Sequence, residues 1–269
     1  MNFVSKKHDR EKQAWMIIAP ELKEHDTEIL LSEEEHHYVS HVLRLKLGME
    51  VDVCNLKGLS GKATVIECKK NFTTLNILNT FYHTKTKPTL KMFIGLTKIS
   101  TLEDIVSQVS ELGCDELHIF PTEKCVHKGT LKLEKLNKIS AESVRISKNP
   151  YATKIFAYHS LSDFLAHVKQ DEPQLVLFCD EKISELSACS FILPTLQQKV
   201  EKNCCAIGIL VGPEASFSPQ ERSEILQKLN PHCVSLGSSI LKVQNAVLSS
   251  LSIVLEFVRT RYTAQQKHS

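Results

Sequence analysis

The spacing of apolar residues changes partway along the chain and divides it into two parts. In the first part, short runs typical of β-strands are separated by tight turns, at 14–19, 51–55, 63–68 and 72–78. One helix is expected among them, from the capping pattern Ser32-Glu33-Glu34-Glu35 to a stop at Gly48. Short strands with tight turns over about 80 residues predict a small β-barrel.

From about residue 88, runs that favour buried strands alternate with amphipathic helices. Strands are predicted at 90–96, 116–120, 155–158, 175–179, 205–211 and 233–236. Helices are predicted at 102–112, 131–147, 163–168, from 218 onward and at 243–258. Several strands are apolar on both faces, which is typical of a mostly parallel sheet covered by helices on two sides. We therefore predict two domains, 1–85 and 86–269, the second with an α/β fold.

Two glycine-containing turns follow strands of the second domain, at the end of a strand where open α/β sheets bind ligands. The first, Gly212-Pro213-Glu214, precedes a helix whose start is marked by Ser218-Pro219-Gln220-Glu221. Gly212 would let a ligand approach the backbone, and Pro213 would stiffen the loop. The second turn, Leu236-Gly237, comes before Ile240-Leu241 and the last helix. We expect the two turns to lie side by side and to enclose one ligand.

Composition narrows the class of protein only slightly. Apolar residues make up 42% and charged residues 24%, as in a soluble globular protein, and no apolar run reaches the roughly 18 residues of a membrane span. Residues 1–13 are polar and lack the apolar stretch of a signal peptide, so we interpret them as a frayed arm of a cytoplasmic protein. A net charge of +2 does not indicate a nucleic-acid partner, although lysines cluster at 85–91 and 124–138.

No group of side chains in the sequence predicts a metal site. The nine cysteines include no C-x-x-C pair and are interpreted as reduced core residues. His37 and His41 have the i,i+4 spacing of a metal-binding pair, but no third ligand is evident, so we interpret them as surface or packing residues. No G-x-G-x-x-G follows an early strand, which argues against a Rossmann-type dinucleotide enzyme.

Six short segments occur in an order that is typical of one protein family. They are His36 to Gly48, Glu111-Leu112-Gly113, Thr122 to Cys125, Ala141-Glu142-Ser143 with Arg145 and Pro150, Leu210 to Glu214, and Leu236-Gly237 with Ile240-Leu241. Together they resemble the RsmE family of the SPOUT superfamily, which methylates N3 of a uridine in 16S ribosomal RNA of the small ribosomal subunit. The resemblance implies a PUA-like β-barrel, then a SPOUT α/β domain with a C-terminal trefoil knot, S-adenosylmethionine (SAM) as cofactor and a homodimer.

The resemblance also implies roles for individual residues. Contacts to SAM are expected from Leu177, Leu210, Gly212, Pro213, Glu214, Leu236, Gly237, Ile240 and Leu241. Arg145 is expected to hold a phosphate or the substrate base, Lys242 is the second candidate for that role, and Glu214 is the candidate general base. The positively charged residues expected to contact RNA phosphates are Arg44, Lys46, Lys124 and Lys128.

The sequence departs from the family pattern beside the expected cofactor site. The family has Gly-Gly where this chain has Ala215-Ser216, and a side chain makes backbone conformations with positive φ costly. Lys242 replaces an arginine and loses its two-pronged fork, and Gln244 replaces a glutamate. Three interpretations therefore stay open: an N3-uridine methyltransferase, which we favour, a non-catalytic rRNA-binding or assembly protein, and a knotted methyltransferase of other specificity, such as ribose 2′-O.

Overall fold

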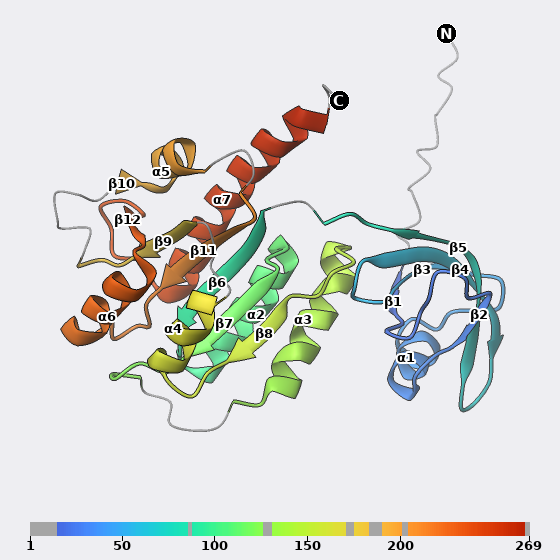
Figure 1. Ribbon diagram of the computed structural model, residues 1–269. Coiled ribbons are helices and arrows are strands. Elements are labelled where there is room, and N and C mark those ends of the chain that lie inside the picture. The colour runs from blue at the N-terminus through green and yellow to red at the C-terminus, as the bar shows by residue number, and fades with distance from the viewer. Residues whose placement is uncertain are drawn as a thin grey trace, which may run out of the picture. The chain divides into compact units, whose positions relative to one another are not determined.

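The structure is a computed structural model that describes residues 15–85, 88–125, 131–170, 175–182, 190–200 and 204–266, without the side chains of 169–170 and 262–266. The chain divides into two compact units, Met1–Thr84 and Lys85–Ser269 (Figure 1). The expected frayed arm, residues 1–13, and the expected RNA contact Lys128 lie outside the described residues.

The first unit is built on a mixed sheet, which has five strands among the residues described, in the order β1-β3-β4-β5-β2. The strands are β1 (Met16–Ile18), β2 (Glu28–Leu30), β3 (Glu50–Cys54), β4 (Leu59–Cys68) and β5 (Thr73–Tyr82). β1 lies parallel to β3, and the other neighbours are antiparallel. Register shifts at Lys62/Ala63 and Val65/Glu67 bend the β4–β5 pair, which lets it curve around a core that includes Val51, Val53 and Leu75.

The helix expected between Ser32 and Gly48 is shorter and changes its winding. Helix α1 (Glu33–His37) begins at Ser32, whose Oγ accepts the Glu35 N–H at 3.3 Å. The chain then winds as a π-helix, η1 (Tyr38–Val42). Two residues after this helix, Arg44 adopts a left-handed conformation with φ at 52°. The predicted end at Gly48 is therefore wrong, because the wider turn and the left-handed residue stop the helix earlier.

The second unit contains a sheet whose described strands all run parallel, in the order β10-β12-β9-β11-β6-β7-β8. Its strands are β6 (Thr89–Gly95), β7 (Glu116–Phe120), β8 (Lys154–Ala157), β9 (Leu175–Cys179), β10 (Ser190–Phe191), β11 (Ala206–Val211) and β12 (His232–Ser235). Its helices are α2 (Ile99–Leu112), α3 (Leu133–Ser147), α4 (Leu161–Gln170), α5 (Ile192–Lys199), α6 (Pro219–Leu229) and α7 (Val243–Gln266). The predicted α/β fold with a mostly parallel sheet is confirmed.

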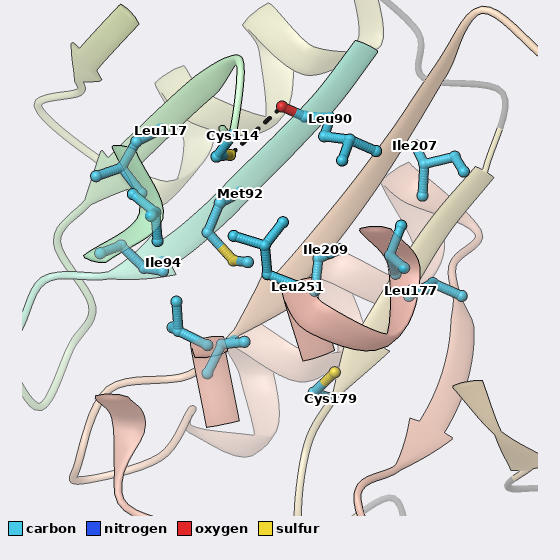
Figure 2. Close-up of a cluster of buried hydrophobic side chains, with 14 of the residues drawn as sticks. Leu90, Met92, Ile94, Cys114, Leu117, Leu177, Cys179, Ile207, Ile209 and Leu251 are labelled. Atoms are coloured by element: carbon cyan, nitrogen blue, oxygen red, sulfur yellow. Dashed lines mark hydrogen bonds between the residues drawn. The ribbon is translucent and has the colours of Figure 1, made fainter. Parts of the chain in front are cut away.

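Helices cover this sheet on both faces, as the apolar strands predicted. Alternate residues of β6 point to opposite sides, so that Met92 joins a core with α2, α5 and α7, while Phe93 joins one with α4 and α6. Figure 2 shows the first of these cores, with Met92, Ile209 and Leu251 brought together from two strands and α7. Because the central strands are buried on both faces, the residues there that a ligand can reach are those at the strand ends.

The register aligns four strand ends at one edge of the sheet. Val211 of β11 pairs with Ile94 of β6 and Cys179 of β9, and Cys179 pairs in turn with Val234 of β12. The next residues along each strand therefore form a row at the carboxyl edge, in the order Ser235, Asp180, Gly212 and Gly95. β11 is inserted between β6 and β9, although it follows both in the chain.

Candidate functional site

The two glycine turns lie at the same edge of the sheet. Gly212 follows β11 and Gly237 lies two residues beyond the end of β12, and β9 is the one strand between them. Neighbouring strands are about 4.8 Å apart, which separates the bases of the two turns by about 10 Å. Asp180, directly after β9, lies between them in the row of strand ends. We refer to residues 212–217 as the β11 loop and to residues 236–242 as the β12 loop.

The β11 loop packs closely against its surroundings. A β-carbon at Gly212 would lie 3.0 Å from the ring of Phe217, and one at Gly95 would lie 2.5 Å from Cδ of Pro213. Both glycines therefore make room for protein atoms of this loop. The Ser216 N–H donates to the Pro213 carbonyl at 2.8 Å and closes a turn, and Ser216 has φ at 57°. Ser216 thus adopts the left-handed backbone conformation that was expected to be costly for a residue with a side chain.

A buried ion pair joins this loop to the sheet. Arg222 of α6 donates from Nε to the Asp180 carboxylate at 2.8 Å and from Nη2 to Ser216 Oγ at 2.6 Å. The side chains of Arg222 and Asp180 are 11% and 1% exposed. The second carboxylate oxygen of Asp180 accepts the Lys182 N–H at 2.9 Å. One guanidinium therefore hydrogen-bonds two strand-end segments at once, with its donors held in a fixed planar geometry that an ammonium lacks.

The start of α6 is fixed by the capping box that the sequence predicted. Ser218 Oγ accepts the Glu221 N–H at 3.2 Å, and the Glu221 carboxylate accepts the Ser218 N–H at 2.8 Å. The same carboxylate accepts the Glu123 N–H at 2.7 Å, which ties the segment after β7 to this helix. Thr122 in that segment has a buried hydroxyl with no hydrogen-bond partner among the described residues.

The β12 loop is held much less closely. Gly237 has φ at 123°, and no described atom comes within 4 Å of a β-carbon built there. Residues 237–240 are exposed, and Ile240 keeps 82% of its accessible surface. Leu236 and Leu241 are partly buried against the core beneath the loop. The loop therefore offers backbone and apolar surface to a ligand at this edge.

The other residues expected at the site differ in how accessible they are. Leu177 and Leu210 are fully buried on opposite faces of the sheet, so any contact they make to a ligand passes through their backbone. Pro213 is buried, whereas Glu214 and Lys242 are exposed at the carboxyl edge. The Gln244 amide donates to the Asp104 carboxylate at 3.1 Å and links the start of α7 to α2.

Arg145 lies away from the two loops. Helix α3 leads from the carboxyl edge, after β7, back to the start of β8, and Arg145 is in its last turn (Figure 1). Its guanidinium pairs with Glu142 on the same helix, with Nε 2.7 Å from the carboxylate. The structure thus places Arg145 toward the amino edge of the sheet, while Gly212, Gly237, Glu214 and Lys242 are at the carboxyl edge.

A second polar cluster is buried where β6, β7 and β8 meet. His118 donates from Nε2 to Glu116 at 3.2 Å and accepts the Tyr158 O–H at Nδ1 at 2.7 Å, and Lys91 lies 3.3 Å from Glu116. The hydrogen bond from His118, together with the charge of Lys91, lowers the pKa of Glu116 to about 2. Burial lowers the pKa of His118 below its ordinary value of 6.5. The cluster is satisfied internally and is structural.

The predicted RNA contacts Arg44, Lys46 and Lys124 are exposed. The rings of His37 and His41 stack at 4.8 Å and 10°, so they lie face to face and do not converge on a metal ion. No group of three or more His, Cys, Asp or Glu side chains in the described part of the chain could hold a metal. Over those same residues, no helix has the length and apolarity needed to cross a bilayer.

Sequence reasoning missed Asp180 and Arg222. Asp180 is the first polar residue after an apolar strand, at the end where ligands collect, and that position was an available signal. Arg222 is a basic residue in the first turns of a helix, where the helix dipole disfavours a positive charge. Such a residue points to an acidic partner elsewhere, but the sequence does not say which one.

Comparison with known proteins identifies the family of the second unit. A model of the RNA methyltransferase domain matches residues 84–255, more than half of the chain. The ribosomal RNA small subunit methyltransferase E of Bacillus subtilis is 26% identical over 243 residues, which cover 87% of this chain and 91% of the relative. Its counterpart in Rickettsia conorii is 25% identical over 232 residues, covering 85% of this chain and 90% of the relative.

A solved structure has the same fold. The ribosomal RNA small subunit methyltransferase E of Neisseria gonorrhoeae, solved bound to S-adenosylmethionine, aligns with a TM-score of 0.77 over 91% of this chain and 98% of that chain. At 16% identity this likeness bears on the fold, and the family model carries the assignment. The resemblance noted in the sequence is confirmed, and this chain belongs to the RNA methyltransferase family.

Proposed function

We propose that this protein is a SAM-dependent methyltransferase that modifies N3 of a uridine in 16S ribosomal RNA. The observation that carries the proposal is the placement of two glycine turns, at Gly212 and Gly237, on one sheet edge inside the region matched by the family model. The relatives named small subunit methyltransferase E, aligned over about nine-tenths of their length, support the small ribosomal subunit as the source of the substrate.

The residues at this edge fit SAM. The open space at Gly237, the exposed side chain of Ile240 and the half-buried Leu236 and Leu241 would accommodate an apolar, planar group such as adenine. On the other side, Gly212, Pro213 and Glu214 would present backbone and a carboxylate, and Leu177 and Leu210 would support the floor from within their strands. When bound, SAM supplies an electrophilic methyl group, so the protein needs no nucleophile of its own.

The work left to the protein is to position the base and to accept the proton of uridine N3. The exposed Glu214 carboxylate is the proposed acceptor, and the exposed Lys242 ammonium is the proposed contact to the base or to a phosphate. Arg145 lies toward the opposite edge, so its proposed contact to the target uridine would come from a second copy of the chain. This placement supports a homodimer in which each site is completed by the partner subunit.

Three finer structural features belong to the same proposal. β11 is inserted between β6 and β9 although it follows both in the chain, and β12 lies beyond β9, an order that supports a trefoil knot in the C-terminal part. The curved mixed sheet of residues 15–84 supports a PUA-like barrel that docks RNA through Arg44 and Lys46. Lys124 and Lys128 of the second domain are proposed as further contacts to RNA phosphates. A ribosomal substrate makes the cytoplasm the proposed location.

The test is methylation of small subunits that lack the modification. Purified protein is incubated with SAM and either free 16S RNA or assembled subunits, and the RNA is digested to nucleosides for mass spectrometry. We expect N3-methyluridine, and a reverse-transcription stop at one uridine, because N3 methylation blocks Watson–Crick pairing. The variants Glu214→Gln and Lys242→Ala are expected to lower kcat more than SAM affinity.

Each rival interpretation predicts a different outcome. A product of 2′-O-methyl nucleosides would identify a different RNA specificity. SAM binding without any methylated nucleoside on either substrate would point to a non-catalytic role on the ribosome. Absence of SAM binding in isothermal titration would reject the proposed cofactor itself.

A further inference from the structure

We propose that Arg222 is a positioning residue that holds the β11 loop in its ligand-binding shape by fixing the conformation of Ser216. The proposal rests on the proposed function, since this loop forms one side of the proposed SAM site. It assigns to Arg222 a role that neither the sequence pattern nor the comparisons give it.

Ser216 adopts a backbone conformation that a side chain disfavours. Its φ is 57°, and its N–H closes the turn on the Pro213 carbonyl at 2.8 Å. Ser216 is the last residue of this four-residue turn, a position at which glycine is favoured because it lacks a β-carbon. Something besides backbone preference must therefore keep Ser216 in this region.

The side-chain contacts of Ser216 identify what holds it. Arg222 Nη2 donates to Ser216 Oγ at 2.6 Å, while Arg222 Nε donates to Asp180 at 2.8 Å. Asp180 lies at the end of β9, a strand with neighbours on both sides, and its second oxygen accepts the Lys182 N–H. The chain of contacts therefore connects a disfavoured residue in the loop to a rigid position in the sheet.

The consequence for the site follows from where the turn lies. Gly212 and Pro213 precede Ser216 in the same loop, and Phe217 packs behind Gly212. If Ser216 relaxed to a negative φ, the carbonyl and N–H groups of residues 212–216 would point in other directions. Arg222 thus acts on SAM through the loop and need not touch it.

The test is a cycle of four proteins: wild type, Arg222→Gln, Ser216→Gly, and the double variant. Two quantities are measured in each, the amide hydrogen exchange of residues 212–218 without ligand and the Kd for SAM by isothermal titration. We expect Arg222→Gln to speed Ser216 amide exchange and to weaken SAM binding, each by about tenfold. In the Ser216→Gly background, Arg222→Gln should alter the exchange rate and the Kd for SAM by less than about threefold, because glycine adopts a positive φ without a stabilising contact.

Lys228→Gln provides the matched control. Lys228 lies on the same helix and pairs with Glu224 at 2.6 Å, but the two side chains of that pair are 40% and 31% exposed. Its loss is expected to leave exchange and SAM affinity unchanged. If Arg222→Gln does not fold because the buried Asp180 carboxylate loses the guanidinium, Asp180→Asn combined with Arg222→Gln removes the carboxylate charge and is carried through the same cycle.

The outcomes separate this inference from the proposed function. Equal losses with and without the Ser216→Gly change, or unchanged exchange in Arg222→Gln, would overturn the positioning role. If no protein binds SAM, wild type included, the proposed function fails, and the exchange comparison alone decides whether Arg222 braces the loop.

Discussion

The β11 and β12 loops leave the same edge of the same sheet, but they are held in different ways. In the β11 loop, Pro213 and Phe217 are buried, and Ser216 accepts a hydrogen bond from Arg222. The helix that follows starts with a complete capping box. In the β12 loop, residues 237–240 are exposed, and no described atom lies within 4 Å of the β-carbon position of Gly237. One side of the candidate site is held by internal contacts, and the other side is open to solvent.

This difference indicates how the free energy of binding is divided. A pre-ordered loop loses little conformational entropy when a ligand binds, whereas an exposed loop loses more and gains apolar contact in return. Substitutions of the buried residues of the β11 loop should therefore act mainly on folding stability, and substitutions of the exposed apolar residues of the β12 loop should act mainly on SAM affinity.

The largest effect is expected from Phe217→Ala. Phe217 is fully buried, stacks with Phe120 at 6.3 Å and meets Phe178 edge-on at 5.6 Å. Removing the ring leaves a cavity and should lower the free energy of unfolding by about 3–5 kcal/mol. Urea denaturation measures this value, and a loss below about 1 kcal/mol would show that the β11 loop is not anchored through its ring.

Gly95→Ala tests the same anchoring from the other side. The new methyl group would lie 2.5 Å from Pro213 Cδ and 3.0 Å from the Pro213 nitrogen. Because a proline ring cannot rotate away, we expect a loss of about 1–3 kcal/mol in unfolding free energy and weaker SAM binding. The control is Gly48→Ala: among the described residues, no atom lies within 4 Å of a β-carbon built at Gly48, so the cost of this change comes from its positive φ alone.

Acid should destabilise the sheet that carries both loops, through the buried cluster of Glu116 and His118 on β7. The pKa of Glu116 falls from 4.5 to about 2 in the folded protein, so the stability it contributes is present above pH 4.5 and is lost as the pH falls from there toward 2. His118 also has a lowered pKa, and its contribution is lost as the pH falls below 6.5. We expect the free energy of unfolding to fall as the pH is lowered from about 7 to about 3, measured by urea unfolding across this range.

The variant His118→Gln separates the two contributions. It should remove the part of the pH dependence that begins near 6.5. It should also lessen the acid-side loss, because the hydrogen bond from His118 is the main cause of the low pKa of Glu116. An unchanged pH profile in this variant would assign the acid sensitivity to other groups.

The smallest effect on stability is expected from Ile240→Ala. Its side chain is 82% exposed, so the unfolding free energy should change by less than about 0.5 kcal/mol. If a ligand covers this residue, the Kd for SAM should rise by about three- to tenfold, because the buried methylene groups are lost. Ile146→Ala is the matched control on α3, with a side chain that is 74% exposed and far along the chain from both loops. Equal SAM affinities for these two variants would remove Ile240 from the site.

The elements of the second domain were predictable where the signal was local. The apolar strands at 116–120 and 175–179 coincide with β7 and β9, and the start of α6 follows from Ser218 and Glu221. The elements that were missed are β2, β10 and α5. Two of them are strands of three and two residues, too short to show a period, and α5 begins at Ile192 with no side-chain cap and has a proline in its first turn.

The candidate site was predictable as two turns, but its internal contacts were not. Gly212 and Gly237 are marked by their place after apolar strands, and the parallel order of the strands brings them to one edge. Asp180 and Arg222 are 42 residues apart, and pairing them requires the order of β9, β11 and α6 in space. The same holds for Gly95 and Pro213. Their close approach leaves no room for a β-carbon at Gly95, and it follows from the strand register, which leaves no trace in the sequence.

The position of β11 also governs how this domain is completed during synthesis. The strand that fills the gap between β6 and β9 is made after both of them, so a growing chain holds two strand edges without a partner until residues 206–211 leave the ribosome. Exposed strand edges are sites of mispairing, and late closure over long sequence separations is slow. In a nascent chain these two edges are therefore open to aggregation until the central strand arrives, and the outer edge of β9 waits longer, for β12.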